Sequence, residues 1–289
     1  MGEGTDHDIC MKLAFSTNAY TKHTLFDALA GIRRAGFGGV EILADTPHAY
    51  PDAIDTHFTA KVLEELERLE LTVSNVNANC SFGYWRHAPP EPYFEPSVIS
   101  PDSQMRADRS RLILKTLDFA AGIGARNISI TSGRLLGGMP PEKAEKQFVE
   151  SMKPILEVAE SLEIDIGIEC EPGLYVEYVE ELAGWCDRLG SKRLGANLDV
   201  GHSVVIGESV AAEVRRMKGR IWNLHVEDLP GRKHYHLIPG EGTFPWAVLK
   251  SALTEIQYDR FLTVELYTHW QNPQEAAEKS FAFLSRHFG

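Results

Sequence analysis

The sequence has few cysteines and no excess of positive charge. It carries four cysteines in 289 residues, and none of them form a CxxC pair. Small secreted domains held by disulfides need a far denser pattern, so this class is excluded and a reducing cytoplasm is the expected location. Acidic residues outnumber basic ones by 41 to 29, which gives a formal net charge of -12. This charge argues against a nucleic-acid partner bound through a broad basic surface.

Long hydrophobic runs are also missing. No stretch approaches the roughly 20 apolar residues that a transmembrane helix needs, so we expect no membrane partner. The first ten residues, MGEGTDHDIC, are polar and acidic and do not resemble a signal peptide. We expect residues 1–10 to form a flexible N-terminal lead-in and residues 11–289 to form a single domain.

Short apolar segments alternate with longer amphipathic ones along the chain. Each strand-like segment is followed by a segment with apolar residues at helical spacing, which predicts eight strand–helix units with none left over. The expected strands cover residues 12–17, 38–43, 71–78, 126–131, 165–170, 194–199, 220–226 and 261–266. Strict alternation of this kind is typical of the α/β class, and eight units close most simply into a (β/α)8 TIM barrel. A doubly wound open sheet is the alternative, but the first strand is not followed by its usual GxGxxG loop.

Two connections are unusually long. Residues 80–104 are rich in proline and aromatic residues, and residues 227–244 are rich in glycine and histidine. Long loops in a compact domain are usually functional or disordered, and loops after barrel strands lie on the catalytic face. We therefore expect residues 80–104 to form a lid. Trp85, Arg86 and His87 in this lid would cover a substrate, or would form a hydrophobic cluster that holds the loop down.

The last four expected strands share a pattern at their ends. Glu169, Asp199, His225 and Glu265 are each flanked on both sides by apolar residues. Because neighbouring residues of a strand point to opposite faces, these four side chains should face the barrel interior and converge at its mouth. One buried acid is readily explained by a lysine or arginine partner. Four ionisable side chains that all face inward from consecutive strands predict a bound divalent cation. Three carboxylates and one imidazole suit Mn²⁺ or Mg²⁺, with Co²⁺ or Zn²⁺ as alternatives.

Several motifs around these residues resemble a known family. The motifs are IGIECEPG, NLDVGHS, NLHVEDLPG, HLIPGEGTFPW and LTVELY. Together they resemble the sugar phosphate isomerase/epimerase superfamily, the xylose isomerase-like TIM barrel group that also contains endonuclease IV. The resemblance covers nearly the whole chain from about Met11. It implies that Glu169, Asp199, His225 and Glu265 match the ligands of the single metal in ketose 3-epimerases, and that His202 matches a substrate-contacting histidine.

The chemistry of such enzymes fits these residue types. Isomerisation or epimerisation removes a proton next to a carbonyl, and a metal stabilises the resulting enediolate. Two carboxylates on opposite faces of a sugar can exchange that proton as base and acid. The resemblance assigns this pair to Glu169 and Glu265, and leaves Asp199 and His225 as plain ligands.

Further residues are candidates for substrate contact, each with a structural alternative. His202 contacts substrate or caps the next helix. Arg232, His234 and His236 contact substrate or belong to a surface loop; His236 matches an endonuclease IV metal ligand, while His234 stands where that family has an aspartate. Glu171 lies two residues after Glu169, so its side chain should point to the same side, and we expect it to support Glu169. Glu41, on the second strand, lines the pocket or forms hydrogen bonds inside the barrel, and we favour the hydrogen bonds.

The leading hypothesis is a metal-dependent isomerase or epimerase of a ketose or related polyol ketone. The alternatives are a dehydratase of the inosose or 3-dehydroshikimate type, an endonuclease IV-like phosphoesterase and a non-catalytic sugar-binding protein. The phosphoesterase branch uses extra histidines on strands three and four, and these are absent from residues 71–78 and 126–131. The resemblance also implies a homo-oligomer, either a dimer or a tetramer.

Overall fold

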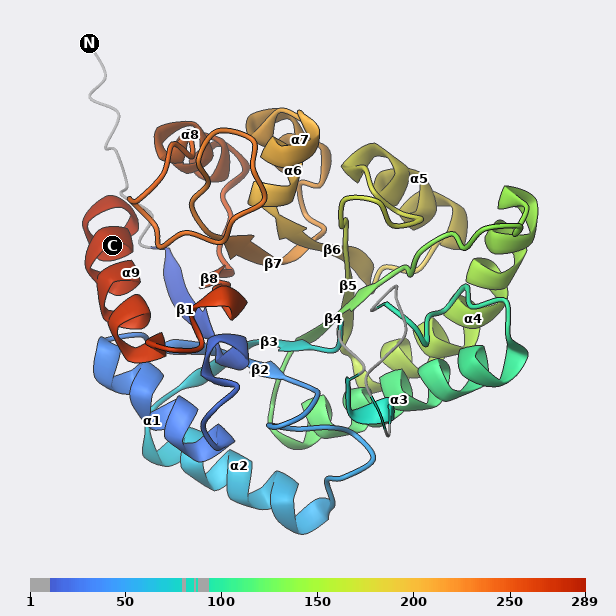
Figure 1. Ribbon diagram of the computed structural model, residues 1–289, viewed down its shortest axis with the longest axis horizontal. Coiled ribbons are helices and arrows are strands. Elements are labelled where there is room, and N and C mark those ends of the chain that lie inside the picture. Colours follow the sequence, from blue (N-terminus) through green and yellow to red (C-terminus); the bar gives the residue numbers. More distant parts are fainter. Residues whose placement is uncertain (1–10, 80–81, 86, 88–93) are drawn as a thin grey trace.

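The computed structural model describes residues 11–79, 82–85, 87 and 94–289. Eight parallel strands close into one barrel, in which each strand pairs with its sequence neighbours and β1 pairs with β8 (Figure 1). The strands are β1 (Lys12–Ser16), β2 (Gly39–Leu43), β3 (Thr72–Asn77), β4 (Asn127–Thr131), β5 (Asp165–Glu169), β6 (Leu194–Asp199), β7 (Ile221–Val226) and β8 (Phe261–Val264). The closed barrel confirms the predicted (β/α)8 fold. The predicted lead-in, residues 1–10, lies outside the described residues.

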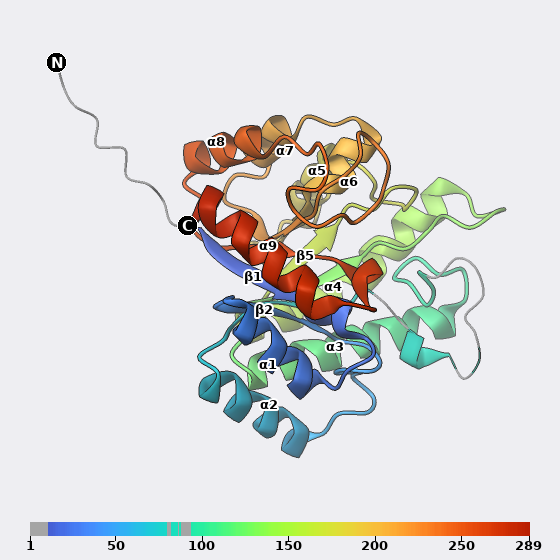
Figure 2. The same ribbon diagram turned by 60° about the vertical axis from the view of Figure 1, so that its left-hand side comes forward.

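Helices surround the barrel on its outside, and α1 and α9 both lie beside β1 (Figure 2). They are α1 (Leu25–Ala35), α2 (Thr56–Arg68), α3 (Ser103–Gly122), α4 (Pro141–Leu162), α5 (Val179–Leu189), α6 (Val200–Ile206), α7 (Val210–Arg216), α8 (Trp246–Ile256) and α9 (Pro273–Phe288). Short 3-10 turns occur at η1 (Thr17–Tyr20), η2 (Phe82–Tyr84) and η3 (Tyr267–His269). Of the helices in the described ranges, none combines the length and apolar composition needed to cross a bilayer.

The prediction of one helix after each strand is wrong after β6, where both α6 and α7 are present. Asp199, the last residue of β6, caps α6 by accepting a hydrogen bond from the His202 backbone N–H at 2.9 Å. Helix α6 then ends after seven residues at Gly207, whose φ of 89° is accessible mainly to glycine. So short a helix has too little apolar periodicity to be recognised, and it starts directly from the strand.

The barrel interior carries many polar side chains, whereas TIM barrels are usually filled by branched apolar ones. Within β2, Val40 and Ile42 are fully buried on either side of Glu41, whose side chain points inward. Hydrogen bonds join the inward groups of different strands, as in the 2.7 Å bond from Thr263 Oγ1 to Asn223 Oδ1. This polar interior lies directly beneath the mouth at which the predicted metal ligands converge.

Candidate active site

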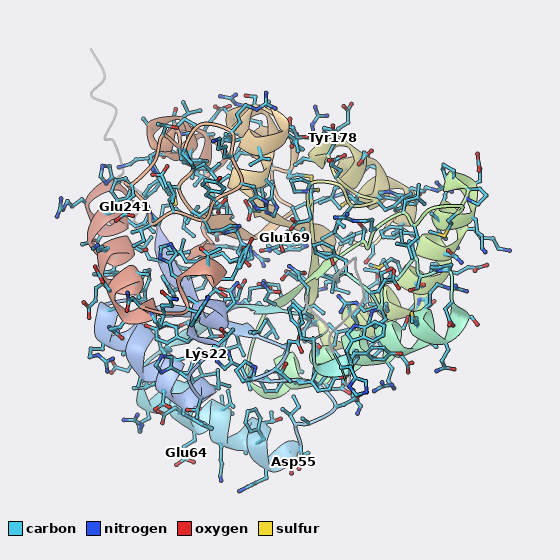
Figure 3. All side chains as sticks on the ribbon, in the orientation of Figure 1. Lys22, Asp55, Glu64, Glu169, Tyr178 and Glu241 are labelled. Carbon is cyan, nitrogen blue, oxygen red and sulfur yellow. The ribbon has the colours of Figure 1, made fainter. Side chains whose placement is uncertain are left out.

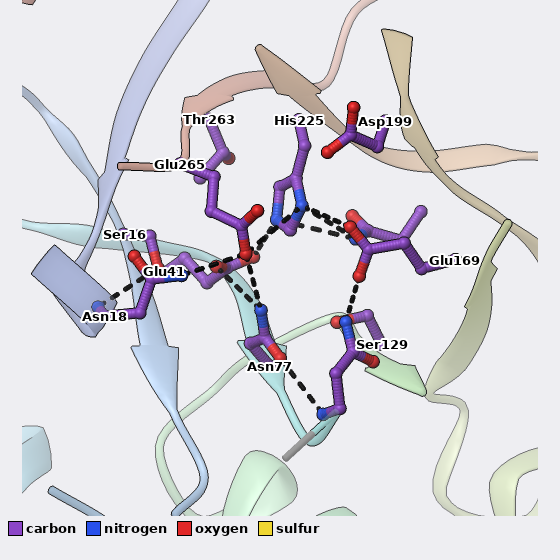
Figure 4. A network of polar contacts seen from close by, with 12 residues as sticks. Ser16, Asn18, Glu41, Asn77, Ser129, Glu169, Asp199, His225, Thr263 and Glu265 are labelled. Carbon is purple, nitrogen blue, oxygen red and sulfur yellow. Dashed lines mark hydrogen bonds and ion pairs between the residues drawn. The ribbon is translucent and has the colours of Figure 1, made fainter. Parts of the chain in front are cut away.

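Four side chains from consecutive strands meet at the C-terminal end of the barrel. Glu169 and Asp199 end β5 and β6, His225 is the penultimate residue of β7, and Glu265 directly follows β8. Each offers a ligand atom within 4.8 Å of the others, and all four residues are buried. Glu169 lies at the centre of the barrel in Figure 3, and Figure 4 shows His225 between Glu169 and Glu265. The predicted convergence of these residues is therefore observed.

His225 is the centre of this cluster. Its Nδ1 lies 2.8 Å from Glu169 Oε1 and 3.8 Å from Glu265 Oε1. Its Nε2 lies 2.6 Å from Glu41 Oε2. Asparagine amides hold the two glutamates: Asn18 donates to Glu265 Oε1 at 2.9 Å, and Asn79 donates to Glu169 Oε2. The carboxylate ends of both glutamates are thus held by residues that follow β1 and β3.

The charges of the cluster are strongly perturbed. Burial raises the pKa of Glu265 well above its ordinary value, and the carboxylates of Glu169 and Glu41 add to this although His225 opposes it. Burial by itself lowers the pKa of His225, but the surrounding carboxylates outweigh it and raise that pKa well above its ordinary value. Asp199 Oδ2 is buried without a hydrogen-bond partner among the described residues. An oxygen-rich donor set with an orphaned carboxylate oxygen fits a divalent cation.

These pKa shifts predict that Mn²⁺ affinity rises with pH. The pKa values of His225 and Glu265 are both raised, so each group tends to carry a proton that a cation must displace. Affinity should increase about tenfold per pH unit for each proton released, and level off once the pH exceeds these pKa values. Calorimetric Mn²⁺ titrations in buffers of different ionisation enthalpy count the released protons. An affinity unchanged between about pH 6 and pH 8 would contradict this assignment.

A cavity of about 350 Å³ lies over the cluster. Its wall includes two of the predicted metal ligands, Glu169 and Glu265, and four of the predicted substrate contacts. The described lining residues are Asn18, Thr21, Leu43, Thr46, Asn77, Asn79, Phe82, Phe94, Thr131, Glu169, Glu171, His202, His234, His236, Glu265 and Tyr267. None of the described lining residues is a lysine or an arginine. The wall therefore offers carboxylates, amides and imidazoles in place of the cations that a phosphate group prefers.

Three histidines form one side of the cavity. The Nε2 atoms of His202 and His236 each lie 3.0 Å from His234 Nε2. His202 Nδ1 lies 3.0 Å from the Cys170 carbonyl oxygen, and His236 Nδ1 lies 2.9 Å from the Glu265 carbonyl oxygen. Because the carbonyls can only accept, both Nδ1 atoms donate, and the Nε2 atoms face the cavity. These three residues also have the spacing of a metal-binding group.

Glu171 lies in the cavity wall, with Oε2 3.6 Å from His202 Nε2. Burial, reinforced by Glu169 and Asp199, raises the pKa of Glu171 to about 7 even though His202 opposes the shift. Glu171 is thus a cavity residue next to His202.

The sequence of this chain matches a known family. A family model described as xylose isomerase-like TIM barrel matches residues 29–287. The chain belongs to that family. Fructoselysine 3-epimerase of Escherichia coli O157:H7 is 22% identical over 266 residues, which cover 91% of this chain and 92% of the relative.

Solved structures share the fold of this xylose isomerase-like barrel. A structure of D-psicose 3-epimerase in the presence of D-fructose has a TM-score of 0.78 at 16% identity, covering 96% of this chain and 100% of that one. A structure of the protein IOLI with a binding zinc atom has a TM-score of 0.75 at 17% identity, with the same coverage. At these identities the likeness establishes the fold.

Two predicted substrate contacts of the xylose isomerase-like barrel lie elsewhere than at the cavity. Arg232 turns to α6 and donates from Nη2 to the Val205 carbonyl at 3.0 Å. Trp85 donates from Nε1 to the Glu95 carbonyl at 3.0 Å and is not among the described lining residues. Strand periodicity does not set the direction of a loop side chain, so substrate contact by Arg232 and Trp85 stays a prediction.

The predicted lid, residues 80–104, is described only in part. Residues 80–81, 86 and 88–93, which include Arg86, lie outside the described residues. Phe82 and Phe94 line the cavity, and the backbone N–H of Gly83 donates to Asp45 Oδ1 at 2.8 Å. His87 is exposed. Phe82 and Phe94, from the described parts of this connection, therefore form an apolar part of the cavity wall.

Other cavity residues were missed by the sequence analysis. Asn77 and Asn79 belong to the segment SNVNAN, in which asparagines recur at every second position. This period of two places their side chains on one face of β3 and its extension, and could have identified them. Asn18 and Tyr267 belong to the 3-10 turns after β1 and β8, which carry no comparable periodicity.

Gly201, in the first turn of α6, lies next to Asp199, one of the predicted metal ligands. A Cβ atom at this position would lie 1.5 Å from Glu227 Oε1, and Glu227 is fully buried. Gly201→Ala should therefore destabilise the fold by about 1–3 kcal/mol and weaken Mn²⁺ binding by displacing the start of α6. Thermal unfolding and Mn²⁺ titration measure both effects. Gly184→Ala in α5, where the added Cβ meets nothing within 4 Å, is the matched control. Equal stability of the two variants would refute the predicted clash.

Proposed function

We propose that this protein is a metal-dependent sugar epimerase or isomerase that acts on a ketose or related polyol ketone through an enediolate. The observation that carries the proposal is the pair Glu169 and Glu265, which line one cavity and flank His225 from two sides. Two carboxylates placed on either side of a bound substrate can remove and return a proton on opposite faces. The sugar epimerase names of the relatives support the same activity.

The proposed metal ligands are Glu169, Asp199, His225 and Glu265, and Mn²⁺ is the cation we favour. A divalent cation bound there would supply Lewis-acid stabilisation of the negative charge that develops on the substrate oxygens. One of the two glutamates, ionised at the start, takes the proton from the carbon next to the carbonyl. The other, protonated at the start, donates its own proton to the opposite face. Asn18 and Asn79 keep the two carboxylates in place during the exchange.

His202, His234, His236 and Glu171 are the proposed substrate contacts, because they line the cavity beside this pair. Their imidazole and carboxylate groups suit sugar hydroxyls, and we propose an unphosphorylated substrate because the described wall lacks lysine and arginine. We further propose a role in carbohydrate metabolism in the cytoplasm and a homo-oligomeric assembly. Cys170 and Cys186 are free and buried, in keeping with a reducing compartment.

A dehydratase would start from the same proton removal and then expel water, so the two activities must be separated by their products. Incubation of the Mn²⁺-loaded protein with a panel of ketoses and inososes in deuterated water, followed by NMR, distinguishes them. The proposal predicts one solvent deuterium at the inverted carbon and conservation of all hydroxyl groups. Loss of a hydroxyl without inversion would assign the dehydratase, and no exchange with any member of the panel would contradict proton transfer at this site.

A further inference from the structure

Glu41 contacts a proposed metal ligand without lining the cavity. It lies on β2, across the barrel from His225 on β7, and is fully buried. Its Oε2 lies 2.6 Å from His225 Nε2, the shortest contact that this ring makes to a carboxylate. Glu41 is absent from the group of four residues whose ligand atoms converge. A buried carboxylate in this position needs a role other than metal ligation.

The two nitrogens of His225 face different carboxylates. Nδ1 faces Glu169 and Glu265, on the side of the cluster, and Nε2 faces Glu41, on the side of the barrel interior (Figure 4). An imidazole that binds a cation offers the lone pair of one nitrogen and keeps its proton on the other. An ionised carboxylate can only accept a hydrogen bond, so Glu41 favours the tautomer of His225 that carries its proton on Nε2.

Glu41 is itself held in place by amide groups. Asn75 Nδ2 donates to Glu41 Oε2 at 2.8 Å, and Asn77 Nδ2 donates to Oε1 at 3.3 Å. Asn223 Nδ2 lies 3.5 Å from Oε2. These donors come from β3 and β7, so the carboxylate cannot move without breaking bonds to two strands.

We propose that Glu41 is a positioning residue that fixes the ring orientation and tautomer of His225, so that Nδ1 presents its lone pair to the metal. This inference rests on the proposed metal centre and adds to it a carboxylate–histidine–metal arrangement built across the barrel from β2. Glu41 acts through His225 and touches neither cation nor substrate. Loss of such a partner typically weakens metal affinity by about 10–100-fold.

The test combines Mn²⁺ affinity with the protonation state of His225. Glu41→Ala should weaken Mn²⁺ binding about 10–100-fold, and Glu41→Gln should recover part of the loss because its amide oxygen can accept from Nε2. Ser74→Ala is the matched control, because Ser74 is a buried hydroxyl of the same interior that bonds Thr263. Its affinity should stay at the wild-type value. Glu41→Ala binding Mn²⁺ as tightly as the wild type would overturn the inference.

Nitrogen-15 NMR of the Zn²⁺-loaded wild type decides the question even if Glu41→Ala does not fold. The inference predicts a metal-bound Nδ1 and a proton on Nε2 of His225. A metal-bound Nε2 with the proton on Nδ1 would overturn it. Failure of the proposed metal centre itself looks different, because the wild-type protein would then bind neither Mn²⁺ nor Zn²⁺ at this histidine.

Discussion

Glu265→Gln is expected to reduce turnover by about 10²–10⁴-fold at saturating Mn²⁺, because it removes one of the two groups that carry the proton. The carboxylate of Glu265 lines the cavity and lies 3.8 Å from His225 Nδ1. Glutamine keeps the size of the side chain and an oxygen that can accept from Asn18, which bonds Glu265 Oε1 in the native protein. The loss should therefore reflect proton transfer and metal ligation more than a change of fold. Steady-state turnover of the ketose identified in the panel measures it.

The deuterium exchange of each epimer separates the roles of the two glutamates. If Glu265 serves one face and Glu169 the other, each single glutamine variant should still exchange the substrate proton of one epimer while failing to interconvert the two. Glu213→Gln on α7 is a matched control, because it changes a buried glutamate paired with Arg216 outside the site. Near-full turnover by Glu265→Gln would show that the acid–base assignment is wrong.

Asp199→Asn is expected to weaken Mn²⁺ affinity by about 100-fold or more, since it removes the negative charge of a proposed ligand while keeping the side-chain shape. Asp199 occupies two positions at once: it belongs to the group of four converging residues proposed as metal ligands, and it caps α6 through the His202 backbone N–H. Asparagine is as good an N-cap as aspartate, so α6 should persist. The variant thereby isolates the metal function from the folding function. Calorimetric titration of chelator-treated protein measures the affinity.

The same substitution at another helix start provides the control for this variant. Asp55 caps α2 by accepting from the Phe58 backbone N–H at 2.7 Å and lies far from the cluster in sequence and in fold. Asp55→Asn should leave Mn²⁺ affinity at the wild-type value and change stability by no more than Asp199→Asn does. If both variants bound Mn²⁺ equally well, Asp199 would be a cap and nothing more.

The convergence of the four proposed metal ligands is predictable from the sequence because two simple regularities determine it. Strand periodicity sets which side chains face the barrel interior, and parallel closure brings the C-terminal strand ends to one mouth. Glu169, Asp199, His225 and Glu265 satisfy both, and the structure brings them together. The same logic applies to Glu41, for which we favoured hydrogen bonds inside the barrel, and it forms them with His225 and Asn75.

Features outside the strands could not be predicted in this way. Arg232 and Trp85 lie in long connections, where the direction of a side chain depends on tertiary contacts such as those to Val205 and Glu95. His202 lies in the first turn of α6, whose N-cap is Asp199 and not the histidine. An aspartate that is both a strand end and a helix cap gives no separate signal for the helix.

The number of metal ions per chain tests the central claim most directly. Protein purified without chelator, then stripped and titrated with Mn²⁺, should bind one ion at the cluster of Glu169, Asp199, His225 and Glu265. That ion should be lost in Asp199→Asn and retained in His234→Ala, whose imidazole belongs to the separate histidine group. No binding at millimolar Mn²⁺, or an ion lost in His234→Ala and retained in Asp199→Asn, would contradict the account.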